Sequence, residues 1–191
     1  SSAASDVYKR QDNKLYLVSS NDWNLPQTEN AYKWFLEKLT FLMEEAPATS
    51  ETVAQIVSGD EKKARILKEL LLADLGISDV TVKNISGKAP VITTTHRVIG
   101  ADGSVEHFQL LMDQESSGTQ RFFSRIGGWL QALENGALLV VDEIEDSLHP
   151  LLTKRLIEMV QDNTINTEGA QLLFTTHDAM PVSYTHLTLP T

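Results

Sequence analysis

The stretch that decides the fold covers residues 115–178 and reads ESSGTQRFFSRIGGWLQALENGALLVVDEIEDSLHPLLTKRLIEMVQDNTINTEGAQLLFTTHD. Two apolar runs, residues 137–142 and 170–176, have the composition of buried parallel strands. Residues 118–134 and 150–162 carry apolar side chains at helical spacing. Strand, helix and strand in succession predict a βαβ unit, and with it an α/β fold that contains a parallel sheet.

Two acids follow the first of these strands. Asp142 and Glu143 stand directly behind the apolar run, in the Walker B pattern. Ligands of open parallel sheets bind beyond the carboxyl ends of the strands, where these acids stand. The first acid suits Mg²⁺, and the second can orient or deprotonate a water in phosphoryl transfer. The alternative is that paired acids simply begin the next helix, whose dipole favours negative charge.

A serine-rich turn, ESSGTQ at 115–120, precedes a predicted helix. Ser116, Ser117 and Thr119 offer hydroxyls, and Gly118 lets the backbone approach a ligand closely. Together with the amides of the helix N-terminus these groups make a candidate anion site. An ordinary serine N-cap followed by a glycine is the alternative.

The second strand ends at a histidine, His177. A neutral imidazole at this place can hydrogen-bond a terminal phosphate, and the alternative is a polar strand end without function. The serine turn, the paired acids and the histidine occur in an order and in strand contexts that agree with one another. Their joint occurrence favours a nucleotide site over three unrelated features.

The motifs ESSGTQ, LLVVDE, EDSLHP and TTHD resemble the signature motif, Walker B motif, D-loop and switch histidine of ABC-type, AAA-like P-loop ATPases. The resemblance is to the chromosome-maintenance and RecF-like branch, and within it to bacterial ATPases linked to antiviral defence or to partner nucleases. It implies a partial P-loop NTPase fold, an ABC ATPase head, with ATP and Mg²⁺ as ligands.

The resemblance also implies roles for single residues. Asp142 would hold Mg²⁺ through water, Glu143 would be the catalytic base, and His177 would contact the γ-phosphate of ATP. Ser147 and His149 would belong to the D-loop, which communicates across a dimer of two heads.

In such a homodimer each signature motif caps the ATP that the other copy holds. Ser116 and Gly118 would therefore act in trans, and Ser117 and Thr119 would line the same loop. Glu115 stands where transporters usually carry leucine, so the resemblance is to this branch and not to transporters.

The phosphate-binding loop of P-loop ATPases, GxxxxGK[ST], has no match in the sequence. The only Gly-Lys pair, Gly87-Lys88, is followed by Ala89, and Val82 holds the position of the first glycine. In the family this loop lies N-terminal to the helical region. We therefore expect that the chain by itself neither binds ATP in cis nor hydrolyses it. By the family's strand order, the strand that leads to this loop would lie beside 170–176. We therefore expect its absence to leave an open, apolar edge there.

The N-terminal part, residues 12–76, is expected to form the helical region of the ATPase head. An amphipathic helix is predicted over 28–45 and a short one over 51–57, and Asp60 opens a third with Gly76 as its C-cap. The faces expected to pack on a core hold Tyr32, Phe35, Leu36, Leu39, Leu42 and Met43 in the first helix and Ile66, Leu67, Leu70 and Leu71 in the third.

Residues 77–114 are expected to form short β-strands, followed by a lobe over 115–180 that carries the four motifs. The strand candidates are 77–84, 91–98 and 105–112, the last two joined as a small antiparallel hairpin by GADG at 100–103. His96 and His107 lie on these strands, where a single histidine is typically a surface or satisfied residue.

The two ends, 1–11 (SSAASDVYKRQ) and 181–191, show neither apolar periodicity nor cap logic. They resemble translated DNA of a transposase-based sequencing adapter, because opposite strands of one oligonucleotide can encode both ends. We therefore expect both segments to be non-native, and they are left out of the fold argument.

Composition narrows the class of protein. The 191 residues include 16 Lys and Arg against 26 Asp and Glu, a formal net charge of −10. Nucleic acid is a possible partner that this charge does not support. The chain has no cysteine, which excludes disulfides and cysteine-based zinc sites. No apolar run could span a bilayer, so we expect no membrane contact and a cytoplasmic location.

The leading interpretation is an ATPase whose intact parent drives or gates an effector or nuclease partner in bacterial defence or DNA maintenance. Two alternatives stay open. One is a nucleotide-sensing dimerisation module with little hydrolysis. The other is an ATP-gated nuclease whose nuclease domain lies outside this sequence.

Overall fold

The computed structural model of the protein describes residues 15–42, 49–73, 75–84, 86, 89–100 and 102–177. Segments 1–11 and 181–191, and Asp178, lie outside the described residues. The elements, in chain order, are α2 (Tyr16–Asp22), α3 (Pro26–Lys38), β1 (Leu39–Leu42), α4 (Thr49–Ser58), α5 (Asp60–Leu72), β2 (Ile77–Lys83), β3 (Val91–Ile99), β4 (Val105–Leu111), the 3₁₀ turn η1 (Met112–Gln114), α6 (Ser117–Glu134), β5 (Leu138–Val141), α7 (Pro150–Gln161) and β6 (Gln171–Phe174).

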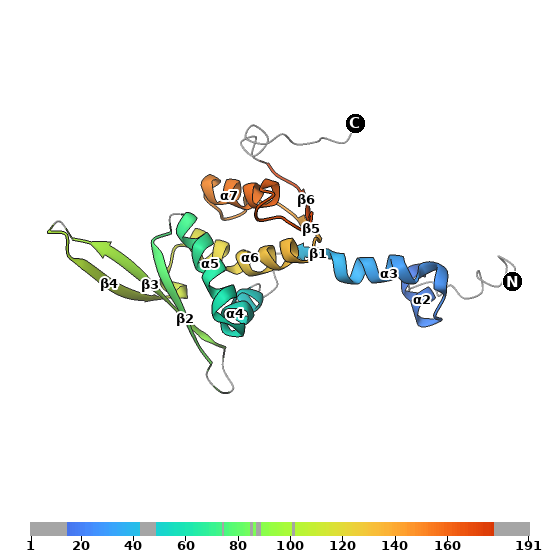
Figure 1. Cartoon of the computed structure of the whole chain (residues 1–191), viewed down its shortest axis with the longest axis horizontal. Helices are drawn as coiled ribbons and strands as arrows, with labels where there is room; N and C mark the ends of the chain where they lie inside the picture. Colours follow the sequence, from blue (N-terminus) through green and yellow to red (C-terminus); the bar gives the residue numbers. More distant parts are fainter. Residues whose placement is uncertain are drawn as a thin grey trace, which may run out of the picture.

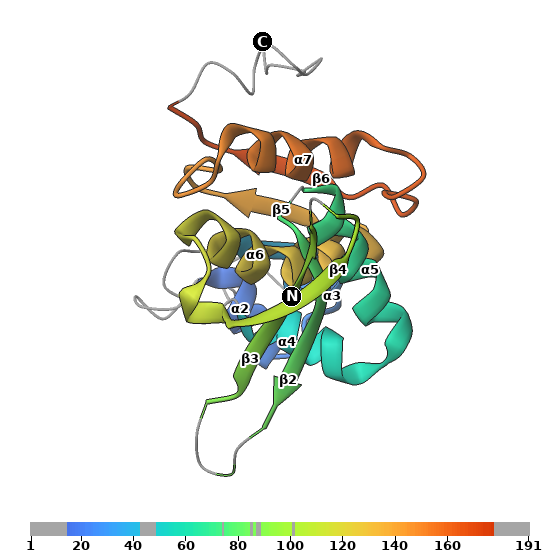
Figure 2. The ribbon, with the colours of Figure 1, turned by 90° about the vertical axis from the view of Figure 1, so that its left-hand side faces the viewer.

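A three-stranded parallel sheet with the strand order β1-β5-β6 lies in the middle of the molecule (Figure 1). β5 and β6 pair from Leu138 opposite Gln171 to Val141 opposite Phe174, with α7 as the crossover between them. Figure 2 shows α7 and α6 beside this sheet, and both helices contact its strands. The predicted βαβ unit is therefore confirmed, and the fold is a mixed α/β one.

Strand β1 corrects the prediction of one helix over 28–45. α3 ends at Lys38, and residues 39–42 run parallel to β5. Helical periodicity is a local signal, whereas the hydrogen bonds that β1 gains from β5 come from a segment far along the chain. The expected packing is also wrong, since no residue of α3 is buried and Phe35 and Leu36 are 51% and 66% exposed. Met43 lies outside the described residues.

A second sheet is antiparallel, with the order β2-β3-β4. The turn that GADG predicts joins β3 to β4, with Gly100 N donating to Ser104 O at 2.8 Å and Gly103 N to Gly100 O at 2.9 Å. The three strands and the hairpin predicted over 77–114 are thus confirmed. Figure 1 shows this hairpin projecting from one end of the molecule while α2 and α3 project from the other.

The core gathers around α6, in which Phe122, Phe123, Ile126 and Trp129 are fully buried. α4 packs closely against it, because a Cβ on Gly127 would lie 2.4 Å from the Cα of Thr52. The Thr52 hydroxyl accepts from Gly127 N at 3.0 Å and donates to Phe123 O at 2.8 Å. The predicted helices α4 and α6 are confirmed.

Helix α5 is confirmed in position but not at its end. It stops at Leu72 with Ala73 as C-cap, so the expected cap at Gly76 is wrong. Gly76 instead takes a positive φ of 68° just before β2, at the turn from helix to strand. Ile66 and Leu70 are fully buried, whereas Leu71 is 65% exposed and does not belong to the packed face.

Among the strands that the structure describes, β6 pairs with β5 alone and therefore forms an edge of the parallel sheet. Leu173 on this edge is 60% exposed. Within the described residues, no helix combines the length and the apolar character needed to cross a bilayer.

Candidate functional site

The loops that follow β5 and β6 meet through one hydroxyl. Thr175 Oγ1 donates to Asp142 Oδ1 and accepts from Glu143 N at 2.8 Å. One residue further, Ile144 N donates to Thr175 O at 3.1 Å. These bonds hold the two acids at the carboxyl edge of the sheet, which is where ligands of parallel sheets bind.

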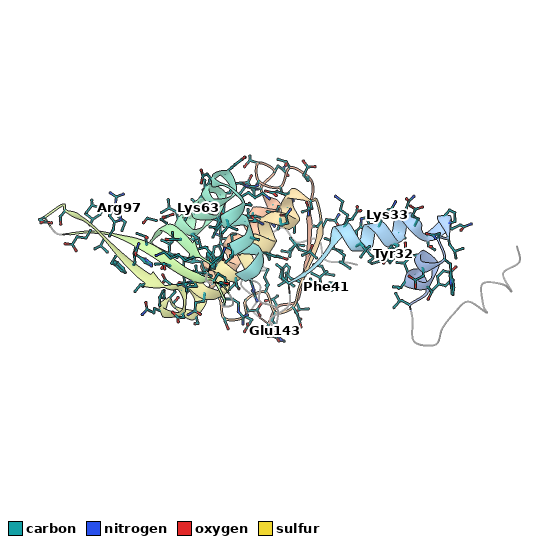
Figure 3. All side chains as sticks on the ribbon, turned by 90° about the horizontal axis from the view of Figure 1, so that it is seen from below. Tyr32, Lys33, Phe41, Lys63, Arg97 and Glu143 are labelled. Carbon is teal, nitrogen blue, oxygen red and sulfur yellow. The ribbon has the colours of Figure 1, made fainter. Side chains whose placement is uncertain are left out.

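Glu143 and His177 face each other across this edge. The distance from His177 Nε2 to Glu143 Oε1 is 3.1 Å, and the two side chains are 83% and 51% exposed. His177 N also donates to Glu145 Oε1 at 2.5 Å. Both side chains are therefore open to solvent and to an incoming ligand. In Figure 3, Glu143 is at the surface of the central body, between the hairpin that carries Arg97 and the helix that carries Lys33.

The backbone at Glu143 is strained, with φ at 46° in the left-handed region. Residues other than glycine rarely adopt this conformation, and where they do they cluster at functional sites. The strain is held by neighbouring bonds, since Glu143 N donates to Thr175 Oγ1 and Glu143 O accepts from Asp146 N at 2.8 Å.

Two arginines of α6 fasten the loop that carries the acids. Arg125, which is only 5% exposed, donates from Nη1 to Ile144 O at 2.7 Å. Arg121 Nη2 donates to Asp146 Oδ2 at 2.8 Å. Sequence reasoning missed Arg121, Arg125 and Thr175. The one available signal was the pair of arginines four residues apart, the two basic residues of this helix.

The serine turn forms the N-terminus of α6, with Ser116 as N-cap. Ser116 Oγ accepts from Thr119 N at 3.1 Å and lies 2.8 Å from Thr119 Oγ1. The alternative of an ordinary serine cap is therefore realised, and it coexists with the exposed side chain of Ser117. Gly118 lies beside the D-loop segment, since a Cβ on it would be 3.7 Å from Ser147 O.

Ser147 and His149, the two residues predicted to belong to a D-loop, have local roles. Ser147 has a positive φ of 54°, and its Oγ donates to Asp146 Oδ1 at 3.3 Å. His149 is the N-cap of α7, where its Nδ1 accepts from Leu151 N at 3.3 Å. Both residues lie in the connection between β5 and α7.

The expected site residues fall into two groups. Asp142, Glu143 and His177 form one group through Thr175. The turn 116–119 forms the other, near Ser147. Over the described residues, no hydrogen bond or ion pair joins the hydroxyls of the turn to the first group.

The donor set fits a Mg²⁺ ion held mainly by water and phosphate oxygens. Asp142 supplies a carboxylate with a hydroxyl beside it. No group of three or more His, Cys, Asp or Glu side chains that could hold a metal occurs among residues 15–42, 49–73, 75–84, 86, 89–100 and 102–177. Mg²⁺ commonly binds through one or two carboxylates together with substrate phosphates and waters, so one facing carboxylate suffices.

An apolar cavity of about 370 Å³ adjoins this group and ends at Asp142 and Thr175. It runs across all three strands of the parallel sheet. Its other lining residues are Phe41, Leu42, Val140, Val141, Leu173 and Phe174. Among the described residues this face of the sheet is apolar, and Phe41 and Leu173 on it are 55% and 60% exposed.

Acids and a histidine at the carboxyl edge of a parallel sheet, beside a crossover helix, stand where α/β domains bind their ligands, which makes this edge the candidate ligand site. The chain belongs to the family described as "AAA domain, putative AbiEii toxin, Type IV TA system", whose model matches residues 6–180. No curated protein and no solved structure matches it. Membership in an AAA family indicates a nucleotide-binding domain with ATPase-type activity, for which ATP and Mg²⁺ are the usual ligands.

Proposed function

We propose that this chain is the C-terminal part of an ABC/AAA-like ATPase of the chromosome-maintenance and RecF-like branch. Its ATP hydrolysis would drive or gate an effector, such as a nuclease, in bacterial defence or DNA maintenance, in the cytoplasm. The observation that carries the proposal is the cluster of Asp142, Glu143 and His177 around Thr175 at the sheet edge.

In the proposed reaction Glu143 takes a proton from the water that attacks the γ-phosphate of ATP. The hydrogen bond of 3.1 Å to His177 Nε2 orients the Glu143 carboxylate, and the bond from Glu143 N to Thr175 fixes its backbone. His177 is exposed enough to turn toward the terminal phosphate. Asp142 would hold Mg²⁺ through water. The ion would neutralise part of the phosphate charge.

The serine turn would complete a nucleotide site on a second copy of the chain. Ser117 is exposed, and the free amides of the first turn of α6 suit an anion. Ser116 and Thr119 shape this turn through their mutual hydrogen bond, and Gly118 leaves room beside Ser147. The proposal therefore includes a homodimer with ATP between the two copies.

The substitution Glu143→Gln tests the proposal in the protein that contains the phosphate-binding loop. Steady-state hydrolysis of MgATP is expected to fall by about 10²-fold or more, the range that a positioned base contributes. MgATP-dependent dimers, measured by light scattering, are expected to persist because the carboxamide keeps the shape of the site.

Glu158→Gln is the matched control, because Glu158 is an exposed acid of α7 that pairs with Lys154 and not with the site. Unchanged turnover in Glu143→Gln would remove Glu143 from its role. The 191-residue chain has no GxxxxGK[ST] loop and is expected to show no turnover of its own, so Mg²⁺-dependent hydrolysis by the purified chain would contradict the expectation that activity requires this loop.

A further inference from the structure

Glu115 directly precedes the turn 116–119, and its side chain is buried against the antiparallel sheet. The carboxylate is 7% exposed, and His96 Nε2 of β3 lies 2.6 Å from its Oε1. The hydroxyl of Thr94, a fully buried residue of the same strand, donates to the same oxygen. A carboxylate with two such partners in a nearly dry place is held firmly, because leaving either side unpaired costs its desolvation energy.

His96 is itself fixed from several sides. Its ring stacks on Phe108 of β4 with centroids 4.9 Å apart and an angle of 11° between the planes. Gly76 lies against the other ring nitrogen, since a Cβ there would be 3.5 Å from Nδ1. The imidazole is therefore a rigid part of the sheet, and Glu115 is attached to all three strands through it.

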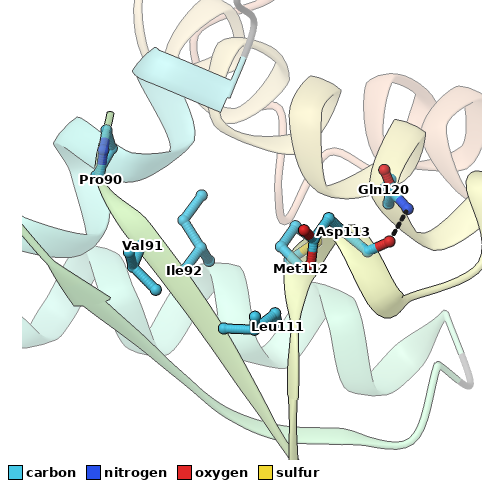
Figure 4. A pocket seen from close by; sticks show the side chains of 7 residues that line it. All are labelled: Pro90, Val91, Ile92, Leu111, Met112, Asp113 and Gln120. Atoms are coloured by element: carbon cyan, nitrogen blue, oxygen red, sulfur yellow. Dashed lines mark hydrogen bonds between the residues drawn. The ribbon is translucent and has the colours of Figure 1, made fainter. Parts of the chain in front are cut away.

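The main chain of Glu115 is bound as well. Its O accepts from Gln120 Nε2 at 2.8 Å, and its N donates to Met112 O at 3.3 Å. Gln120 also donates to Asp113 O at 3.3 Å, and it lines a cavity of about 340 Å³ between the sheet and the start of α6 (Figure 4). Because side-chain packing between the sheet and the start of α6 leaves a cavity, the hydrogen bonds of Glu115 supply much of the contact between them.

We propose that Glu115 and His96 are positioning residues that hold the turn 116–119 in the place where it meets nucleotide. The inference rests on the proposed function, because the turn is there assigned to the ATP of a second copy. Glu115 is adjacent to Ser116 in the chain, so the side chain bonded to β3 determines where the helix cap begins. The antiparallel sheet thereby becomes part of the dimer-forming site without touching the ligand.

The first readout uses the chain as it is and follows amide hydrogen exchange. Glu115→Ala is expected to speed exchange of Thr119 N and Gln120 N, which bond to Ser116 in the first turn of α6, by about tenfold or more, while amides of β5 keep their rates. Glu115→Gln can still accept from His96 and Thr94 and is expected to restore rates to within about threefold. Glu106→Ala is the matched control, because Glu106 is an exposed acid on β4 of the same sheet.

The second readout uses the protein with its phosphate-binding loop. Glu115→Ala and His96→Leu are expected to raise the protein concentration for half-maximal MgATP-driven dimerisation by about tenfold, equivalent to about 1.4 kcal/mol. The turnover of the saturated dimer is expected to stay within about threefold, since Glu143 and His177 lie in the other group. If the two residues were merely structural, their loss would lower the melting temperature without this difference between dimerisation and turnover. Glu115→Gln would then not restore dimerisation.

The outcomes separate the two proposals. If Glu143→Gln stops hydrolysis but Glu115→Ala and His96→Leu leave both exchange and dimerisation unchanged, the positioning role is overturned and the ATPase assignment stands. If Glu143→Gln leaves turnover unchanged, the ATPase assignment itself fails. If Glu115→Ala does not fold, the test of the positioning role rests on His96→Leu and Glu115→Gln. The positioning role is overturned if His96→Leu dimerises at the same protein concentration as the wild type.

Discussion

Thr175 shows how one hydroxyl can organise a site that the paired acids alone would not form. Its Oγ1 is donor to Asp142 and acceptor for the main chain of Glu143, so both loops depend on it. An apolar residue of the same shape would leave a carboxylate and an amide without this partner, although both can turn to water at this exposed edge. The loss is then the modest net value of a hydrogen bond and not a full desolvation cost.

Thr175→Val is accordingly expected to lower the free energy of unfolding by about 1 kcal/mol, measured by urea denaturation of the chain. Thr175→Ser keeps the hydroxyl and is expected to stay within about 0.5 kcal/mol of the wild type. A loss in Thr175→Ser without a loss in Thr175→Val would show that the methyl group, and not the hydroxyl, holds the loops.

At the residue scale, the sequence predicted the acids and the histidine but not what holds them. Asp142, Glu143 and His177 follow apolar runs and could be recognised from their place in the pattern. Arg125 looks like an ordinary polar residue of a helix, and its role appears only when α6 lies under the loop and brings it to Ile144 O. Contacts between residues far apart in sequence have no local signature.

At the scale of elements, α6 and α4 form the tightest contact in the molecule. The hydroxyl of Thr52 and the amide of Gln55 both bond to the backbone of Gly127, which requires that no side chain stand between them. Glycine costs helix propensity, and here that cost is offset by close approach and by satisfied buried polar groups.

Gly127→Ala is expected to destabilise the chain by about 1–3 kcal/mol or more, because the added methyl would meet the Thr52 backbone at 2.4 Å. Gly59→Ser is the matched control, since nothing lies within 4 Å of a Cβ at this N-cap of α5 and serine is a favoured cap. Thermal unfolding followed by circular dichroism measures both. A change below about 0.5 kcal/mol in Gly127→Ala would mean that α4 can shift freely.

The same scale shows where sequence patterns were sufficient. β5 and β6 lie within apolar runs with turn signals on both sides, so a local pattern identified them, but β6 is an edge strand and not the buried strand that its composition predicts. β1 is read locally as the end of a helix, because Leu39 and Leu42 continue the spacing of α3, and only pairing with β5 makes it a strand. The antiparallel strands were predictable since GADG supplies a turn between two β-rich segments.

At the scale of the whole molecule, large apolar side chains are exposed on several elements, among them the parallel sheet and α3. The cavity of about 370 Å³, the open edge of β6 and the exposed face of α3 all lie outside the packed core. Exposed apolar patches and open edges both favour association between chains. The isolated chain is therefore expected to associate as its concentration rises.

Leu173→Lys is expected to reduce this association in sedimentation experiments without lowering the melting temperature, because the side chain is 60% exposed on an edge strand. Leu151→Lys provides the comparison, since Leu151 is 67% exposed on α7 rather than on the edge. Equal effects of the two lysines would indicate a general gain in solubility, and the edge would then have no special part.

The pairing of β1 with β5 also determines the order in which the chain assembles. Leu138 and Gln171 close a loop of about 30 residues, whereas Leu39 and Leu138 close one of about 100. Loop-closure entropy grows with the logarithm of length, so the longer closure costs about 1 kcal/mol more. The βαβ unit can therefore nucleate folding by itself. Strand β1 docks afterwards. The helices that precede it, α2 and α3, contribute little to the core, so we expect them to unfold first.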